Sequence, residues 1–209
     1  MDTSITYTPD VLNLIFLFGL KGGPTMPRWI LEPGHTAAEF CARHMMVSHV
    51  RGHFKNVHGS LEFDPENPKE FSVEVTIDAT QIWTGDEERD GHLRSADFLD
   101  VENHPDITFK GNQLETIGPH DYMVTGDLTI RSVTHQAKLN IRYMGQWETP
   151  MWEDGEDKGP KIRAGFVAKT KINRNDFGVS WNGTLVKGGI VVGNMVEITF
   201  DAEAILESD

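Results

Sequence analysis

The sequence predicts an all-β fold of about eight antiparallel strands, arranged either as a sandwich or as an up-and-down barrel. From Trp29 onward, apolar and polar residues alternate with a period of two, which is typical of strands with one buried and one wet face. Residue pairs that contain Gly, Pro or Asn and favour turns separate the alternating segments. One short segment carries the start signal of a helix.

The strands follow in chain order from a segment in which Ala38, Phe40, Ala42, His44 and Met46 share one face. The same alternation recurs in residues 71–79, 122–130, 137–143, 162–172 and 196–204. Turns are predicted at Asp64-Pro65, Gly118-Pro119, Gly159-Pro160, Asn182-Gly183 and Gly188-Gly189. The acidic stretch Trp147–Lys158 is predicted to be a loop, because strand alternation resumes directly after it.

One short helix is predicted from about Asp86 to Leu93. Thr84 and Glu87 have the spacing of a capping box, in which each side chain bonds a free backbone N–H at the helix start. Apolar residues return at Phe98 and Leu99. We therefore expect this segment to bury them against one end of a barrel and to act as a plug.

The composition excludes several classes of function. The chain has 209 residues, enough for one domain with a real core or at most two small ones, and 19 Lys+Arg against 32 Asp+Glu give a formal net charge of −13. Such a charge repels phosphate backbones and anionic membrane surfaces, so we expect no nucleic-acid partner. Cys41 is the single cysteine, which excludes an intramolecular disulfide and any cysteine-based metal site.

Residues 1–25 are expected to form an extension outside a barrel domain at residues 26–209, because regular alternation begins only after Met26. Their apolar run, Val11–Leu20, is about half the ~20 residues that a membrane span needs, so we expect no stable membrane insertion. Acidic residues precede this run where a secretory signal has basic ones, and no small-residue cleavage site follows. A cytoplasmic location is therefore expected.

The nine histidines raise the question of a metal site, but their spacing argues against one. His49 and His53 have the i,i+4 spacing that binds zinc on a helix. In a strand, however, the two side chains lie ~13 Å apart, too far to share one ion. We therefore predict no metal. His44 shares a face with apolar residues, and we expect a core histidine with satisfied hydrogen bonds or a contact for a ligand head group.

The charged cluster Asp86–Asp97 contains every residue type that a hydrolase needs for general acid–base catalysis. A solvated helix face explains the same residues, through i,i+4 pairs such as Glu88 with His92 and Asp90 with Arg94. The sequence has no G-x-S-x-G elbow, P-loop or G-x-G-x-x-G motif. We therefore predict no catalytic residues and no enzymatic activity.

Six motifs follow one another in order along the chain: Pro33-Gly-His35-Thr36, Val50-Arg-Gly52-His-Phe54, Gly59-Ser-Leu61, Asp90-Gly-His92-Leu93-Arg94-Ser95-Ala96-Asp97-Phe98, Gly126-Asp127-Leu128-Thr129-Ile130 and Asn173-Arg174-Asn175-Asp176-Phe177-Gly178. Through them, the chain from Trp29 to Leu206 resembles the YceI family of lipocalin-like, polyisoprenoid-binding proteins. This resemblance implies an eight-stranded antiparallel lipocalin-like barrel, with a short helix covering one end and an isoprenoid chain in an apolar tunnel. Many members carry a secretory signal, which makes a periplasmic location the alternative.

The resemblance implies a non-enzymatic protein that carries or sequesters a long-chain isoprenoid lipid, either a polyprenyl phosphate or an isoprenoid quinone. No cofactor besides this ligand is expected. The alternative is a stress-linked hydrolase or a regulatory interaction module that uses the Asp86–Asp97 cluster or the acidic residues 148–157. The sequence leaves open which lipid is bound and whether two copies pair as a homodimer.

The expected tunnel lining follows from the inward faces of the strands. Its apolar members are Phe40, Phe54, Val75, Ile77, Leu128, Ile130, Leu139, Ile141, Phe166, Ile172, Ile198 and Phe200. His44, Arg51 and Arg94 are the polar candidates for head-group contacts near a mouth. Because burial contributes roughly 0.8 kcal/mol per CH₂, affinity is expected to come from the chain rather than from the head group.

Overall fold

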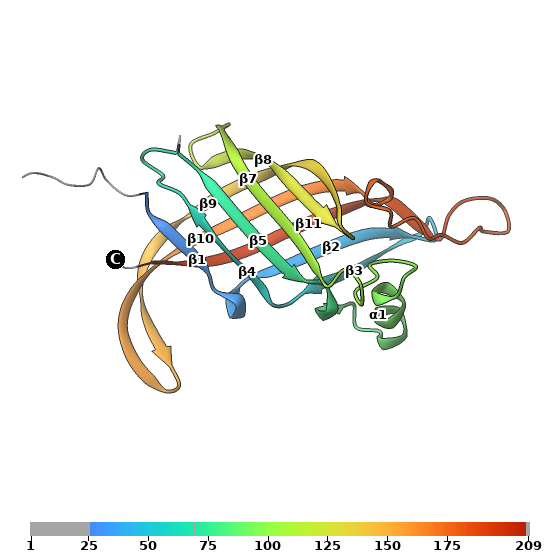
Figure 1. The fold of residues 1–209 in the computed structure, drawn as a ribbon, viewed down its shortest axis with the longest axis horizontal. Coiled ribbons are helices and arrows are strands. Elements are labelled where there is room, and N and C mark those ends of the chain that lie inside the picture. Colours follow the sequence, from blue (N-terminus) through green and yellow to red (C-terminus); the bar gives the residue numbers. More distant parts are fainter. Residues whose placement is uncertain (1–25, 69, 208–209) are drawn as a thin grey trace, which may run out of the picture.

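The computed structural model describes residues 26–68 and 70–207, which form antiparallel strands and one α-helix (Figure 1). The extension predicted for residues 1–25, with its apolar run Val11–Leu20, lies outside the described residues. No helix in the described ranges has the length and apolar character that a membrane crossing requires. The elements are β1 (Arg28–Leu31), β2 (Ala37–His44), β3 (Ser48–Phe54), β4 (Val57–Glu62), β5 (Ser72–Asp78), β6 (Ile82–Trp83), α1 (Glu87–Arg94), β7 (Asp106–Thr116), β8 (Asp121–Ile130), β9 (Val133–Glu153), β10 (Glu156–Asn173) and β11 (Val192–Leu206), with short 3₁₀ turns η1 (Pro33–His35), η2 (Ala79–Gln81) and η3 (Arg174–Phe177).

The barrel is closed by β1, which pairs with β4 on one side and with β11 on the other. Trp29 lies opposite Leu61 in one pairing and opposite Leu206 in the other. The closed ring contains eight strands in the order β1-β4-β5-β7-β8-β9-β10-β11. The predicted eight-stranded antiparallel barrel is therefore confirmed, and closure satisfies the backbone groups that the edges of a sandwich would leave unpaired.

Two interruptions extend one wall of the barrel beyond this ring. The chain breaks between β1 and β2 at the 3₁₀ turn Pro33–His35, and between β3 and β4 at Asn56, which adopts a left-handed φ of 63°. β2 then pairs with the first part of β11, with Phe40 opposite Ile198, and β3 pairs with β2. The strands of this wall run toward α1, which covers that end of the barrel (Figure 1).

The acidic stretch Trp147–Lys158 is not a loop, and this prediction was wrong. β9 and β10 continue through it as a hairpin that projects from the end opposite α1 (Figure 1). The reversal occurs at Asp154-Gly155, both with positive φ, which is the pair that a tight hairpin turn favours. Gly159-Pro160, predicted as a turn, lies inside β10 at a register shift.

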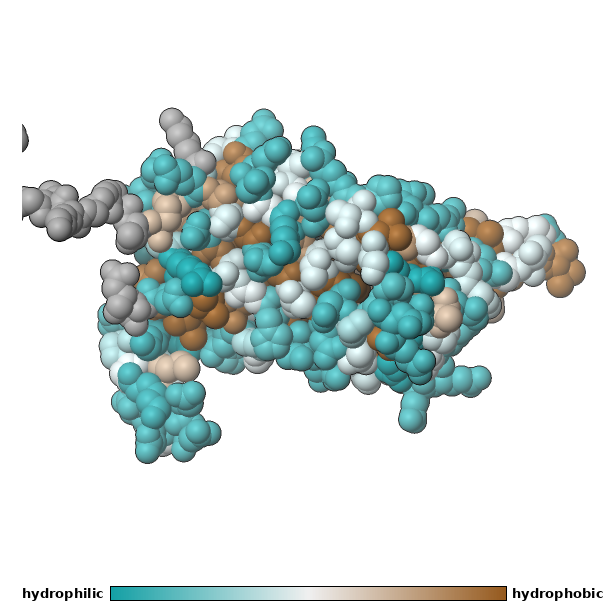
Figure 2. All heavy atoms as spheres, viewed as in Figure 1, coloured by the Kyte–Doolittle hydropathy of each residue, from teal (hydrophilic) through white to brown (hydrophobic). Residues whose placement is uncertain are grey.

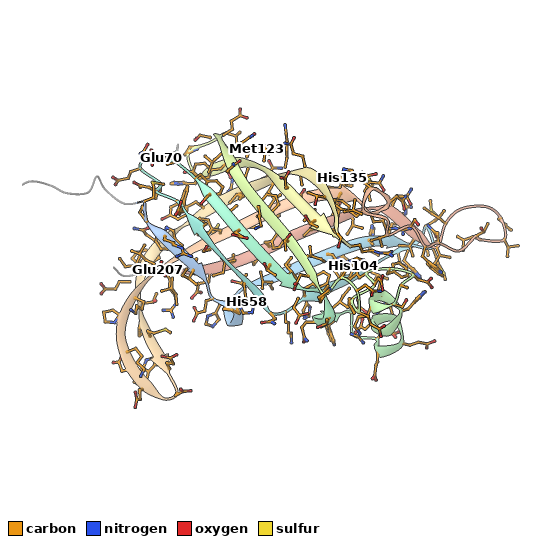
Figure 3. All side chains as sticks on the ribbon, viewed as in Figure 1. His58, Glu70, His104, Met123, His135 and Glu207 are labelled. Carbon is orange, nitrogen blue, oxygen red and sulfur yellow. The ribbon has the colours of Figure 1, made fainter. Side chains whose placement is uncertain are left out.

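Inward and outward side chains alternate along the barrel strands as predicted. In β8, Tyr122, Val124, Gly126, Leu128 and Ile130 are buried, while the positions that alternate with them are at least partly exposed. Polar side chains cover the outside of the barrel, where His104 and His135 lie toward α1 and Glu70 and Glu207 toward the opposite end (Figure 3).

Aromatic rings fill the end of the barrel opposite α1. The ring of Phe63 is 2% exposed and meets Tyr122, Tyr143 and Phe166 edge-on, with ring centroids 5.4, 5.5 and 5.7 Å away. The indole N–H of Trp29 donates to the carbonyl of Phe63 at 2.9 Å and fixes this segment. These rings form an aromatic plug that closes this end of the interior.

Candidate functional site

The barrel interior holds two apolar cavities placed end to end. The first, called the outer cavity, has a volume of about 140 Å³ and lies under α1, with Leu93, Phe98 and Leu99 in its wall. The second, called the inner cavity, has a volume of about 80 Å³ and reaches the aromatic plug at Phe63. Few lining side chains are polar: Thr108, Thr170, Arg174, Thr36 and Tyr122.

The two cavities meet at a waist formed by Phe109, Leu139 and Phe200, which line both of them. Each of these residues points inward from a different strand, because the period of two places every second side chain inside. A slender chain that enters at the α1 end and passes the waist meets apolar side chains until it reaches the plug. The two adjoining cavities are together called the apolar tunnel.

All twelve apolar residues predicted for the lining lie on the walls of this tunnel. Their role as ligand contacts stays a prediction. Those in the outer cavity are Phe40, Phe54, Ile77, Leu128, Ile130, Leu139, Ile172, Ile198 and Phe200. Those in the inner cavity are Val75, Ile141 and Phe166, with Leu139 and Phe200 shared.

None of the three polar candidates for head-group contacts lines the tunnel. His44 ends β2 beside the tight turn at Met45-Met46, so it is partly exposed and not a core histidine. Arg51 points outward because it has the opposite parity to Phe54 on the same strand. Arg94 donates to the carbonyl of Ile82 at 3.3 Å, on the outer side of α1.

The N-cap residue of α1, the helix over the outer cavity, differs from the predicted one. Asp86, rather than Thr84, is the N-cap, and its carboxylate accepts from the backbone N–H of Arg89 at 3.0 Å. Asp90 is buried and accepts from the backbone N–H of Thr84 at 2.9 Å, so the predicted Asp90–Arg94 pair does not form. His92 pairs with Asp97 at 3.0 Å instead of with Glu88.

His92 also joins α1 to the segment that follows η3. Its ring meets Phe98 edge-on at 4.9 Å and Trp181 at 4.7 Å between centroids, and Phe98 and Trp181 lie 5.3 Å apart. Phe98 lines the outer cavity. These contacts place α1 and the Trp181 segment together over the end of the outer cavity farthest from the waist, which is called the mouth of the tunnel, and give the Asp86–Asp97 cluster a structural role.

We expect His92→Ala to lower the free energy of unfolding by about 1 kcal/mol, since it removes two ring contacts and the hydrogen bond to Asp97. Thermal melting measures the structural role of His92. A screen of generic ester and phosphate substrates tests the alternative, catalytic role. His58→Ala, on the outside of β4, is the matched control. Hydrolysis by the parent protein that disappears in a His92→Ala variant with an unchanged melting temperature would refute the structural role.

Arg174 is a buried cation in the wall of the outer cavity. It is 5% exposed and donates four hydrogen bonds to carbonyl oxygens, of Val179 at 2.6 Å, Trp181 at 3.0 Å, Gly193 at 3.0 Å and Val192 at 3.1 Å. Burial lowers the pKa of this guanidinium below its ordinary value. Arg174 thus fixes both ends of the segment between η3 and β11, and no local sequence pattern predicts this role.

A cluster of titratable groups lies near the other end of the barrel, and no sequence motif predicts it. His35 approaches Glu32 at 3.1 Å and Glu203 at 3.7 Å, while Arg163 binds the same two carboxylates at 3.1 and 2.8 Å. Partial burial alone would raise the pKa of Glu32, but hydrogen bonds from Arg163 and His35 outweigh it and lower this pKa. The hydrogen bond to Glu32 raises the pKa of His35. Glu32, His35 and Glu203 have the spacing of metal ligands, yet Arg163 already supplies a positive charge between the carboxylates.

Comparisons with known proteins agree with this architecture. Residues 29–204 match the YceI-like domain. Protein YceI of Escherichia coli is 39% identical over 148 residues, which are 71% of this chain and 73% of that protein. The crystal structure of the Campylobacter jejuni YceI protein matches with a TM-score of 0.64 and 28% identity, over 79% of this chain and 90% of the other. A polyisoprenoid binding domain from Saccharophagus degradans, implicated in plant cell wall breakdown, has the same fold with a TM-score of 0.58 and 12% identity, over 86% of this chain and 98% of the other.

Proposed function

Since the chain belongs to the YceI-like domain family, we propose that its barrel binds a long-chain isoprenoid lipid and carries or sequesters it without chemical change. The observation that carries this proposal is the apolar tunnel, in which two cavities join at Leu139 and continue from α1 to the aromatic plug. An isoprenoid tail is long, slender and apolar, as the tunnel is. The fold is shared with a domain that is described as polyisoprenoid binding.

The free energy of binding would come from the tail. Burial of each CH₂ contributes roughly 0.8 kcal/mol, and many such groups fit along a tunnel that runs through both cavities. Because the walls contain few donors or acceptors, binding would discriminate by chain length and thickness rather than by polar recognition.

The tunnel favours an uncharged head group, and so an isoprenoid quinone over a polyprenyl phosphate. A phosphate buried in the outer cavity would need cations or free donors to replace its hydration. Among the described residues, Arg174 is the only charged side chain that lines either cavity, and its hydrogen bonds already go to four carbonyls. His44, Arg51 and Arg94 lie outside the tunnel wall and offer no substitute.

A second candidate function is supported by the projecting β9–β10 hairpin. Trp147 and Trp152 are 79% and 63% exposed on it, beside Glu148 and Glu153, which suits contact with a basic partner. This interaction role would leave the tunnel without a purpose. An extract of the purified protein that holds no isoprenoid would favour it.

The waist offers a test of the main proposal. We expect organic extraction and mass spectrometry of the parent protein to yield a long-chain isoprenoid, and we expect Leu139→Trp to lose it. The larger side chain blocks the passage between the cavities while keeping the interior apolar, at a cost in stability of about 1–3 kcal/mol. Leu139→Met, which nearly conserves volume, is the control and should retain the lipid. A folded Leu139→Trp protein that carries as much long-chain lipid as the parent would contradict the tunnel.

A further inference from the structure

Two turns beside α1 form an exposed apolar tip at one extremity of the molecule. The apolar tip consists of Met45, Met46 and Val47 in the β2–β3 turn, and of Leu185 and Val186 in the loop before β11. Val47 is 86% exposed and Val186 is fully exposed. The tip projects beyond the barrel, and apolar side chains end it at the right of the view (Figures 1 and 2).

The two turns of the tip are held together and anchored at their base. The backbone N–H of Met45 donates to the carbonyl of Val191 at 2.7 Å. The side chain of Asn182 accepts from Val191 and Val192 at 2.9 and 3.0 Å, so the intervening loop leaves the barrel from a fixed point. The loop is thus anchored to the barrel wall. It lies on the same wall as the tunnel mouth, because Val192 both lines the outer cavity and pairs with His44.

The β2–β3 turn places large apolar side chains where the backbone disfavours them. Met45 and Met46 both have positive φ, 46° and 65°, at the two central positions of the His44–Val47 turn, where Asn or Gly is usual. Their side chains are 45% and 44% exposed, so packing inside this protein does not explain them. Both side chains are therefore available to a partner.

The charge around the tip is opposite in sign to that of the whole chain. Residues 40–61 and 177–196 contain no Asp or Glu, although the chain has 32 acidic residues. Arg43, Arg51 and Lys187 are exposed in these segments. The acidic helix α1 lies back from the tip, against the end of the barrel that it covers (Figure 1).

We infer that the apolar tip docks into the surface of a bilayer that contains anionic phospholipid, which places the tunnel mouth at the membrane. Narrow turns can insert Val47 and Val186 between head groups while nearby arginine and lysine side chains bind phosphates. A stable protein interface needs roughly 800 Å² of fitted surface on each side, which two projecting turns do not offer. The use of this docking for lipid exchange rests on the proposed function, but the docking itself does not.

Docking is local, reversible and sensitive to salt. At long range, the net charge of −13 repels an anionic surface. On contact, the basic side chains around the tip attract the same surface. Each basic side chain near such a surface contributes about fivefold in affinity. We therefore expect binding to weaken as ionic strength rises.

Vesicle flotation tests this inference with the full chain. We expect the parent protein to float with vesicles of phosphatidylcholine and phosphatidylglycerol and to float little with phosphatidylcholine alone. Val186→Asp should reduce the bound fraction at least about tenfold, since a fully exposed valine becomes an anion without loss of core packing. Lys187→Gln should reduce affinity about fivefold. Trp147→Asp, on the hairpin at the opposite end, is the matched control and should bind as the parent does.

Three results would overturn the inference: no flotation of the parent, equal flotation of Val186→Asp, or an equal loss in Trp147→Asp. A parent that forms concentration-dependent dimers, broken by Val186→Asp, and does not bind vesicles would assign the tip to a second copy instead. Titration with a detergent-dispersed isoprenoid quinone separates this inference from the proposed function. Val186→Asp should bind the quinone as the parent does, and a parent that floats but binds no quinone would contradict the function alone.

Discussion

Phe166→Asp is expected to abolish isoprenoid binding and to lower the free energy of unfolding by about 4 kcal/mol. Phe166 is 8% exposed in the wall of the inner cavity, and its ring packs 5.7 Å from Phe63 and 5.5 Å from Tyr143. The substitution removes these contacts and places a carboxylate in a largely apolar cavity that no cation of the described residues lines. Urea unfolding and mass spectrometry of extracted lipid measure the two effects separately.

Phe166→Leu is the control, because it keeps the apolar wall while shortening the side chain. It should retain the lipid in a slightly less stable barrel. If Phe166→Asp does not fold, Ile141→Asp provides a second measurement, since Ile141 is only partly buried in the same cavity. A folded aspartate variant with the lipid content of the parent would show that the ligand does not reach the inner cavity.

Arg174→Met is expected to lower the free energy of unfolding by about 3 kcal/mol and to loosen the Trp181 segment over the mouth. Four carbonyls lose a charged donor, although that of Val192 keeps the side-chain amide of Asn182 as a partner. Urea unfolding gives the stability. Faster hydrogen exchange between residues 179 and 193 would report the local opening.

Arg174→Lys separates charge from geometry. A lysine keeps the positive charge, but its single ammonium cannot reach four carbonyls that a planar guanidinium bridges. It should therefore recover only a small part of the lost stability. A lysine variant as stable as the parent would show that the positive charge in this wall, rather than the four hydrogen bonds, provides the stability.

The lining of the tunnel could be predicted from sequence because strand parity is a local property. Once Phe54 is assigned to the inside, Arg51 must face outward, so parity already argued against Arg51 as a head-group contact. The turn Asp154-Gly155 also carried a hairpin signal within the stretch predicted as a loop. Outside the barrel both faces of β9 and β10 are wet, so the alternation that marks the other strands is lost there.

Other features depend on contacts that no local pattern encodes. Arg174 directly follows β10, where an arginine is expected at the surface. It is buried because Val192 and Gly193, distant in the sequence, pack around it and accept its hydrogen bonds. The cap of α1 shifted from Thr84 to Asp86 because the buried carboxylate of Asp90 binds Thr84. Glu32 and Glu203 meet only when β1 pairs with β11.

The aromatic plug at Phe63 makes the tunnel one-ended, and a one-ended tunnel acts as a ruler. In the proposed binding mode, the isoprenoid enters the tunnel with its tail first. It must leave by the same mouth with its head group first. The distance from α1 to Phe63 then sets the longest tail that fits, and every isoprene unit beyond that length stays outside and adds little affinity. Affinity should therefore rise with each added unit up to that length and then level off, so the chain length at the plateau measures the depth of the barrel.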